Sequence, residues 1–259
     1  DRGLTVIGVT TLEQQIEVGK KIVLEKLNTH RFIVYFQAYT NTNAEISELK
    51  QLYNQVLELP GIIGIAVGTR PDSISNEVLH LLSGIRDRGY SVVLELGLQS
   101  ANDNTLQVIN RGHDYAAFQE AIVAAKEFNI ETCAHLIIGL PGETITDNIE
   151  TIKKVVADGI DGVKLHPLHV VKKTKLAELW QNGEYQPLEL DQYAHIVAEM
   201  IRHSPPELIF HRLSAHARGD LLLAPQWCSG RWAVLNRIAQ DLFENGVQGY
   251  YLGRIHEPH

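Results

Sequence analysis

Short apolar runs alternate with helical segments through most of the chain, and this alternation is the feature that most constrains the fold. Strands are predicted at Arg31–Ala38, Gly61–Thr69, Ser91–Gln99, Thr132–Gly139, Gly162–Val171 and Glu207–Leu213. Helices of about three to four turns separate them, which is typical of βα units around a parallel sheet. The sequence therefore predicts an α/β fold, a partial (βα) barrel with a helical C-terminal extension.

Several of the predicted helices carry start signals. Thr11 and Gln14 form a capping box for a first helix. Thr42, with Glu45 three residues on, predicts the start of the next helix, and a third helix is predicted to run through Leu82. The last two predicted helices cover Leu190–His203 and Arg231–Glu244.

The chain opens on a helix where a βα fold should open on a strand. Because a helix in such a fold follows a strand, we expect a first β-strand and its loop upstream of Asp1. No linker or low-complexity segment interrupts the sequence, so we expect a single domain over residues 1–259. Within it, residues 1–187 would form the barrel core and residues 188–259 an extension that completes or caps the barrel.

Composition narrows the classes of protein. The formal net charge of −8 argues against non-specific binding to nucleic acid, which depends on Lys and Arg. The two cysteines, Cys133 and Cys228, are far apart; this fits a reducing compartment and supplies neither a disulfide framework nor a metal site. We expect Cys133 to be a small apolar residue within a strand. No apolar run could span a bilayer and no signal peptide is visible, so we expect a cytoplasmic protein without membrane contact.

Polar residues interrupt strands that should be apolar. Buried parallel strands usually read as continuous apolar runs. Here Glu95 and Gln99 share one strand face, Lys164 and His166 share another, and His135 lies within the strand between them. Because one face of each barrel strand lines the lumen and chemistry is found at the C-terminal mouth, this set predicts a ligand site. The alternative is an internal polar network whose members satisfy one another.

Six segments on successive strands and loops form a recognisable set. They are YFQAYTNT (35–42), VGTRPD (67–72), ELGLQS (95–100), NRGHD (110–114), HLIIGLPGE (135–143) and KLHPLHVVKKT (164–174). Together they resemble the radical S-adenosylmethionine (SAM) superfamily, over nearly the whole chain. They are most similar to the branch that includes oxygen-independent coproporphyrinogen oxidases and the Elongator catalytic subunit. Within this branch they resemble a bacterial family that has no assigned substrate.

The resemblance implies a SAM site at the strand ends. Arg111 would pair with the SAM carboxylate, because a guanidinium can bind both oxygens. Segments 138–140 and 166–168 would flank the adenine, and Thr40 and Asn41 would meet the methionine amino group. By the resemblance, the cofactor-contacting residues are Thr40, Asn41, Glu95, Gln99, Arg111, His135, Ile138, Gly139, Leu140, His166, Pro167 and Leu168.

The sequence departs from the superfamily in two respects. His135 stands where relatives tend to carry an Asp that holds the ribose hydroxyls. The superfamily also binds a [4Fe–4S] cluster through three closely spaced cysteines, which residues 1–259 cannot supply. We expect those cysteines upstream of Asp1, in the loop after the missing first strand, and we expect the chain as given to lack activity.

The resemblance implies reductive cleavage of SAM to a 5′-deoxyadenosyl radical, which takes a hydrogen atom from the substrate. The candidates for contact with the substrate are Lys164, His166, His169, His211 and Arg212. The implied partners are an unidentified substrate and an electron donor such as flavodoxin or ferredoxin. We expect the basic stretch from Arg202 to Arg218 to be a solvated surface, and the alternative is that it binds RNA as a further partner.

Three other functions stay open. Lys164 on a strand could be the amine of a Schiff-base lyase, which borohydride trapping would expose. His135, His166, His169 and His211 could form a zinc or iron hydrolase site if three or four of them converge. A non-catalytic SAM- or RNA-binding homologue would bind its ligand without ever cleaving SAM.

Overall fold

The computed structural model describes residues 11–37, 40–216 and 219–253. The chain divides into two compact units. The N-terminal unit contains residues 2–97 and 120–132, and the C-terminal unit contains residues 98–119 and 133–259. The strand expected upstream of Asp1 lies outside the described residues, and the single domain with a boundary near residue 187 stays a prediction.

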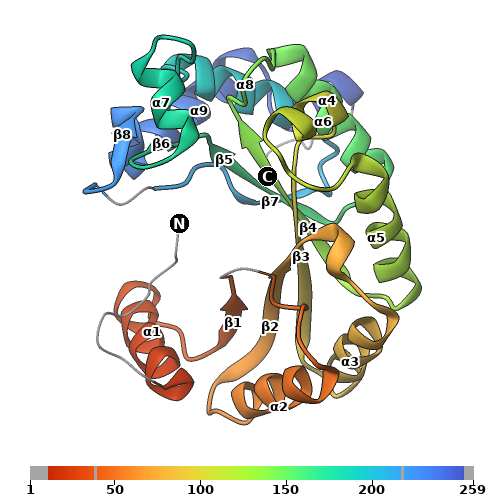
Figure 1. Ribbon diagram of the computed structural model, residues 1–259. Helices are drawn as coiled ribbons and strands as arrows, with labels where there is room; N and C mark the ends of the chain where they lie inside the picture. The colour runs from red at the N-terminus through yellow and green to blue at the C-terminus, as the bar shows by residue number, and fades with distance from the viewer. Residues whose placement is uncertain (1–10, 38–39, 217–218, 254–259) are drawn as a thin grey trace. The chain divides into compact units, whose positions relative to one another are not determined.

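Three parallel strands pair in the N-terminal unit, in the order β1 (Phe32–Phe36), β2 (Ile62–Thr69) and β3 (Ser91–Gln99). The last two residues of β3 belong to the C-terminal unit. The helices of this unit are α1 (Leu12–Leu27), α2 (Ile46–Leu57) and α3 (Asn76–Asp87), with the short η1 (Pro71–Ser73). Figure 1 shows α2 and α3 side by side along the same side of β2. β2 is buried at nearly every position, as expected for a parallel strand covered on both faces.

The prediction that the second helix starts at Thr42 is wrong. The buried Thr42 hydroxyl donates to the Ser73 carbonyl at 2.6 Å and contacts the Thr69 hydroxyl at 2.6 Å. Thr42 therefore ties its loop to the end of β2, and α2 begins only at Ile46, after Glu45.

The predicted boundaries of the other two helices of this unit have different outcomes. α1 begins as predicted, with Thr11 and Gln14 in a capping box. α3 runs to Asp87, beyond the predicted end at Leu82, because Ile85 continues the buried stripe of the helix.

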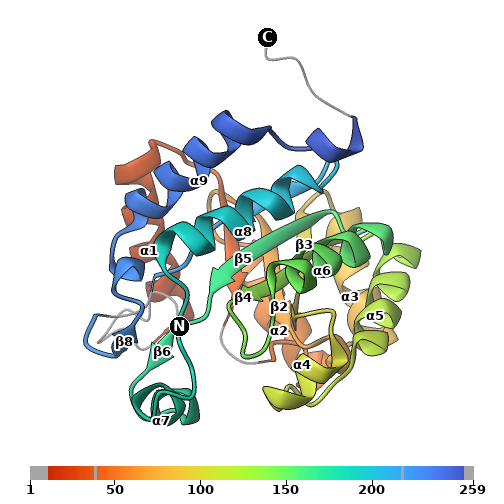
Figure 2. The same cartoon turned by 90° about the horizontal axis from the view of Figure 1, so that it is seen from above.

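Three further parallel strands pair in the C-terminal unit, in the order β4 (Glu131–Ile138), β5 (Gly162–Pro167) and β7 (Ile209–Arg212). The first two residues of β4 belong to the N-terminal unit. Its helices are α4 (Asp103–Val108), α6 (Ile145–Ala157), α7 (Lys175–Gln181), α8 (Leu190–Arg202) and α9 (Arg231–Asn245), with the short η2 (Gln226–Ser229) and η3 (Tyr250–Leu252); α5 (Tyr115–Glu127) has residues in both units. Figure 2 shows α8 alongside β5, with α9 next to α8. Cys133 is fully buried in β4, as predicted. Among the described residues, no helix has the length and apolar character needed to cross a membrane.

The prediction of one strand over Gly162–Val171 is wrong. β5 ends at Pro167, and Val170–Val171 forms β6, which pairs antiparallel with β8 (Leu222–Ala224). Proline has no N–H to donate to a ladder, so it favours the end of a strand. The sequence also gave no prediction of α7 or β8. Together with β6 they surround a small separate core of Val170, Ala177, Tyr185 and Ala224.

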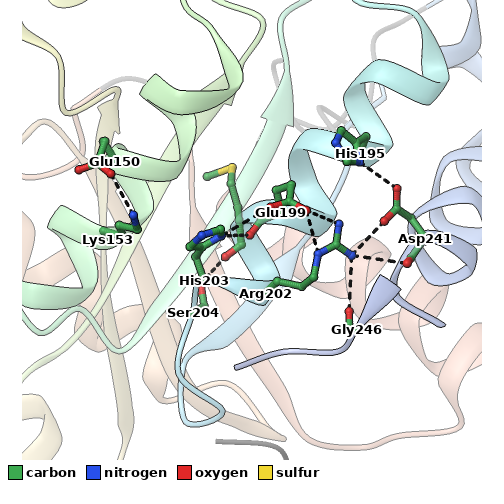
Figure 3. Close-up of polar contacts among 10 residues, drawn as sticks. Glu150, Lys153, His195, Glu199, Arg202, His203, Ser204, Asp241 and Gly246 are labelled. Atoms are coloured by element: carbon green, nitrogen blue, oxygen red, sulfur yellow. Dashed lines mark hydrogen bonds and ion pairs between the residues drawn. The ribbon is translucent and has the colours of Figure 1, made fainter. Parts of the chain in front are cut away.

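The prediction that Arg202 belongs to a solvated basic stretch is wrong. Arg202 is fully buried, and Figure 3 shows its guanidinium between Glu199 and Asp241. Its Nη2 lies 2.6 Å from Glu199 Oε1 and its Nη1 lies 2.9 Å from Asp241 Oδ1. Asp241 also contacts His195 Nδ1 at 3.2 Å. Arg202 therefore joins α8 to α9 and is not available to a polyanion; Arg218, from the same stretch, lies outside the described residues.

Candidate functional site

The ends of β4 and β5 lie side by side in the C-terminal unit. Ile138 pairs with Pro167 in the strand register. The Leu168 N–H donates to the Ile138 carbonyl at 2.9 Å, one step beyond the strands. The two segments predicted to flank an adenine, 138–140 and 166–168, are therefore neighbours in space.

Gly139 makes the turn out of β4. Its φ of +93° lies in the region that favours glycine. Its carbonyl accepts the Tyr185 hydroxyl at 2.8 Å, and a Cβ at this position would lie 3.1 Å from Leu188 Cδ1. The backbone of this turn is thus fixed by the segment 185–188, which the sequence did not associate with the site.

Gln99 ends β3 in an uncommon conformation. Its φ is +82°, which is rare for a residue other than Gly, Asn or Asp and is often found at functional sites. The following residues are held in place: Ser100 donates a short hydrogen bond to Glu143, and the Ala101 N–H donates to Thr151 Oγ1 at 3.2 Å. The turn after β3 is therefore fixed by the loop after β4 and by α6.

Glu143 and Ser100 are residues that the sequence quoted within motifs without giving them a role. Burial raises the pKa of the Glu143 carboxyl, and the hydrogen bond from Ser100 partly offsets this rise. The available signal was a hydroxyl and a carboxyl in two loops that follow strands, but nothing in the sequence paired these residues, which are 43 positions apart.

The polar residues of β4, β5 and β7 are brought together. His135 lies opposite Lys164 in the strand register, and Lys164 lies opposite Arg212. The His135 and His166 rings stack with centroids 5.5 Å apart and planes inclined by 25°. Lys164 is only 9% exposed. Four of the substrate-side and cofactor candidates therefore occupy one part of the C-terminal unit.

His211 and His169 also lie in this part of the C-terminal unit. A Cβ on Gly162 would lie 2.5 Å from His211 Nε2, so the His211 ring covers Gly162 on β5. His169 follows β5, and its Nε2 is buried with no hydrogen-bond partner among the described residues.

Thr40, Asn41 and Glu95 belong to the N-terminal unit. The Asn41 side-chain amide donates to the carbonyls of Phe36 at 3.0 Å and Gly68 at 2.8 Å, so it ties the end of β1 to β2. Thr40 is half-buried and Glu95 is buried. The contacts predicted between these residues and SAM stay predictions.

Arg111 lies in the turn after α4. Its N–H donates to the Leu106 carbonyl at 2.9 Å, and it stands between Asn110 and Gly112, which both have positive φ. The turn thus fixes the backbone of Arg111, and its pairing with the SAM carboxylate stays a prediction.

Two family models match the chain. The model of the radical SAM superfamily matches residues 7–155, and that of the radical SAM C-terminal domain matches residues 160–244. The chain belongs to the radical SAM superfamily. This membership confirms the resemblance found in the sequence, and the cofactors of the superfamily are SAM and a [4Fe–4S] cluster.

Named relatives agree with this membership. Protein YhcC of Escherichia coli (strain K12) is 49% identical to this radical SAM chain over 224 residues, which are 86% of the chain and 72% of YhcC. Elongator complex protein 3 of Homo sapiens is 32% identical over 147 residues, 56% of the chain and 26% of that protein. The solved structure of the archaeal Methanocaldococcus infernus Elp3 with an N-terminal deletion matches with a TM-score of 0.73 at 20% identity, covering 91% of this chain and 58% of that one. The structural match confirms the predicted partial barrel.

The residues of this radical SAM chain do not fit a [4Fe–4S] cluster. Cluster iron needs thiolate ligands, three of them in this superfamily, and the sequence has two cysteines. Cys133 and Cys228 are both buried. In the part of the chain that the structure describes, no group of three or more His, Cys, Asp or Glu could hold a metal ion. The four histidines considered for a zinc or iron site, which are all among the described residues, therefore do not form such a group.

His166 predicts a pH dependence of stability. Burial lowers its pKa to about 3, and the positive charges of His135, Arg212 and Lys164 act in the same direction. A histidine in the unfolded chain titrates near pH 6.5, so between about pH 6.5 and about pH 3 the unfolded state binds a proton that the folded state does not. Stability is therefore complete above pH 6.5 and falls as the pH falls, by up to about 1.4 kcal/mol per pH unit.

Substitution of His166 tests this pH dependence. Urea unfolding between about pH 7 and about pH 5 should show a shallower loss of stability for His166→Asn than for the wild type. His30→Asn, at an exposed position, should keep the wild-type slope. Equal slopes for all three proteins would contradict the assignment.

Proposed function

We propose that the chain provides the SAM-binding part of a radical SAM enzyme, with the adenine held between segments 138–140 and 166–168. The observation that carries this is the hydrogen bond from Leu168 to Ile138, which joins the two segments on a chain of this superfamily. Gly139 supports it, because its positive φ turns the chain out of β4 at the point where the two segments meet. In this superfamily, bound SAM supplies a 5′-deoxyadenosyl radical that removes a hydrogen atom from the substrate.

The residues of this chain would bind and orient the cofactor. Arg111 would hold the SAM carboxylate, and Glu95 and Gln99 would face SAM, with Glu95 near its ribose or amino-acid moiety. The left-handed backbone of Gln99, fixed by the contacts of Ser100 and Ala101, suits a side chain that must be aimed at a ligand. Binding, orientation and shielding are what a protein adds to the chemistry of a cofactor.

A pair of glycine substitutions tests the proposed adenine position. Gly139→Ala and Gly142→Ala both place a Cβ at a positive φ, +93° and +83°, so the backbone strain is similar. Only the Cβ at Gly139 would lie against a neighbouring side chain, and only Gly139 belongs to the proposed site. Equilibrium dialysis with labelled SAM should show at least about tenfold weaker binding for Gly139→Ala, from about 1.4 kcal/mol of lost contact and strain, and little change for Gly142→Ala. Equal effects of the two substitutions would contradict the position.

We also propose that residues 1–259 bind SAM without cleaving it, because they hold too few cysteines for the cluster. A non-catalytic homologue would bind SAM but leave it intact in every form of the protein. A Schiff-base lyase would instead give a borohydride-stable adduct at Lys164 with a carbonyl substrate. These outcomes distinguish a radical SAM enzyme, a non-catalytic SAM-binding homologue and a Schiff-base lyase from one another.

RNA modification is a second candidate, favoured by the 32% identity to Elongator complex protein 3 over 56% of the chain. Its test is whether RNA accelerates SAM cleavage by protein supplied anaerobically with iron, sulfide, SAM and dithionite, and whether the RNA becomes modified. The buried position of Arg202 removes one of the residues that could contact RNA, so His211 and Arg212 would have to contribute.

A further inference from the structure

Five residues of β4, β5 and β7 define what we call the cationic face, although the His166 ring within it is neutral: His135, Lys164, His166, His211 and Arg212. Side chains two apart on a strand share a face, so Gly162, Lys164 and His166 point the same way. The register places His135 on one side of Lys164 and Arg212 on the other. The stacking of His135 on His166, and the position of the His211 ring over Gly162, place both rings on this face.

His166 lies among basic side chains of this face. The charged groups that act on His166 are His135, Arg212, Lys164 and His169, and all of them disfavour a proton on His166. Arg212 keeps its charge at any physiological pH. A negatively charged ligand next to His166 would interact favourably with these groups.

Two ring nitrogens add an independent observation. His166 Nε2 and His169 Nε2 are buried and have no hydrogen-bond partner among the described residues. A buried polar atom without a partner is costly, and such atoms in folded proteins usually meet water or a ligand. The neutral imidazole of His166 can donate a hydrogen bond to an oxyanion from one nitrogen. His169 differs, because its other ring nitrogen already makes a hydrogen bond with the Ala215 backbone.

We propose that the cationic face binds an oxyanion of the substrate, a phosphate or a carboxylate, so that the substrate is an anionic molecule. Arg212 and Lys164 supply charge-assisted hydrogen bonds, and the His166 ring supplies a neutral one. His166 also belongs to the segment 166–168, so the face adjoins the proposed adenine position. The identification of the bound anion as part of the substrate rests on the function proposed above, whereas the anion site itself does not.

Histidine ring signals provide the test. The 259-residue chain, labelled with nitrogen-15 in its histidines, is titrated with inorganic phosphate and separately with acetate. The signals of His166 and His169, assigned with His166→Asn and His169→Asn, should shift and saturate with at least one of the two anions. The anion that binds more tightly shows whether the substrate presents a phosphate or a carboxylate to the site. Saturable shifts elsewhere only, or none, would overturn the proposal.

Variants locate the site. Arg212→Gln and, as a second choice should that variant misfold, Lys164→Gln should weaken anion binding at least about tenfold, the loss expected for one charge-assisted hydrogen bond. Arg237→Gln on α9 removes a half-buried arginine whose partner is Asp191, and should leave the binding unchanged. Equal weakening by Arg237→Gln would mean a general charge effect and would contradict the site.

Competition with SAM separates this proposal from the function on which it rests. Saturating SAM should leave the anion-dependent shifts in place, because the site belongs to the substrate. Displacement of the anion by SAM would assign the face to the SAM carboxylate and overturn the proposal. Anion binding by a chain that binds no SAM would retain the anion site and reject the proposed function.

Discussion

Replacing Arg202 by methionine is expected to lower the free energy of unfolding by about 3–5 kcal/mol. The substitution keeps a long side chain but leaves Glu199 and Asp241 buried without their cation, since these carboxylates are only 14% and 5% exposed. Breaking a buried ion pair from one side costs far more than the pair contributes as a whole. The measurement is urea unfolding followed by circular dichroism at neutral pH.

Arg237 offers the matched control for this prediction. It lies on α9 and contacts Asp191 on α8 at 2.6 Å, but Asp191 is 74% exposed. An exposed pair of this kind contributes about 0–1 kcal/mol, so Arg237→Met should change stability little. If the two substitutions cost the same, Arg202 is not the buried link between the two helices that the structure describes.

Replacing Gly64 by alanine is expected to destabilise the N-terminal unit by about 3 kcal/mol or more. Gly64 of β2 pairs with Ser91 of β3. A Cβ on Gly64 would overlap the Ser91 carbonyl oxygen and would lie 2.7 Å from the Ser91 Cβ. Backbone atoms cannot turn aside as a flexible side chain can, so the two strands would have to separate.

Gly84→Ala should act in the opposite direction. Gly84 is exposed within α3, and a Cβ there would meet no atom within 4 Å. Glycine in a helix interior is less favourable than alanine by about 0.8–1 kcal/mol, so this variant should be slightly more stable than the wild type. Thermal unfolding of both variants checks the pair, and a stable Gly64→Ala protein would contradict the register of β2 and β3.

The sequence predicted the strands and most helices because their signals are local. Apolar runs and caps such as Thr11 lie within a few residues of the elements they define. Thr42 could not be assigned in this way, since its partners Thr69 and Ser73 come from another part of the chain. Arg202 was assigned to the surface for the same reason, because Asp241 reaches it from α9.

The candidate site was predictable in part, through motifs rather than through contacts. The motifs gave Gly139 and the segment around His166, and the structure brings these segments together. The support of Gly139 by Tyr185 and of Ser100 by Glu143 depends on tertiary contacts that no local pattern encodes. The end of β5 at Pro167 could have been predicted, because proline has no N–H to donate to the next strand.

The measurement that tests the central claim most directly is 5′-deoxyadenosine formation from SAM. The protein expressed from its complete gene and the 259-residue chain are each supplied anaerobically with iron, sulfide, SAM and dithionite. We predict cluster absorbance and 5′-deoxyadenosine from the complete gene product, and SAM binding without either from the 259-residue chain. SAM left intact by the complete gene product, with no cluster absorbance, would contradict the proposal that this is a radical SAM enzyme.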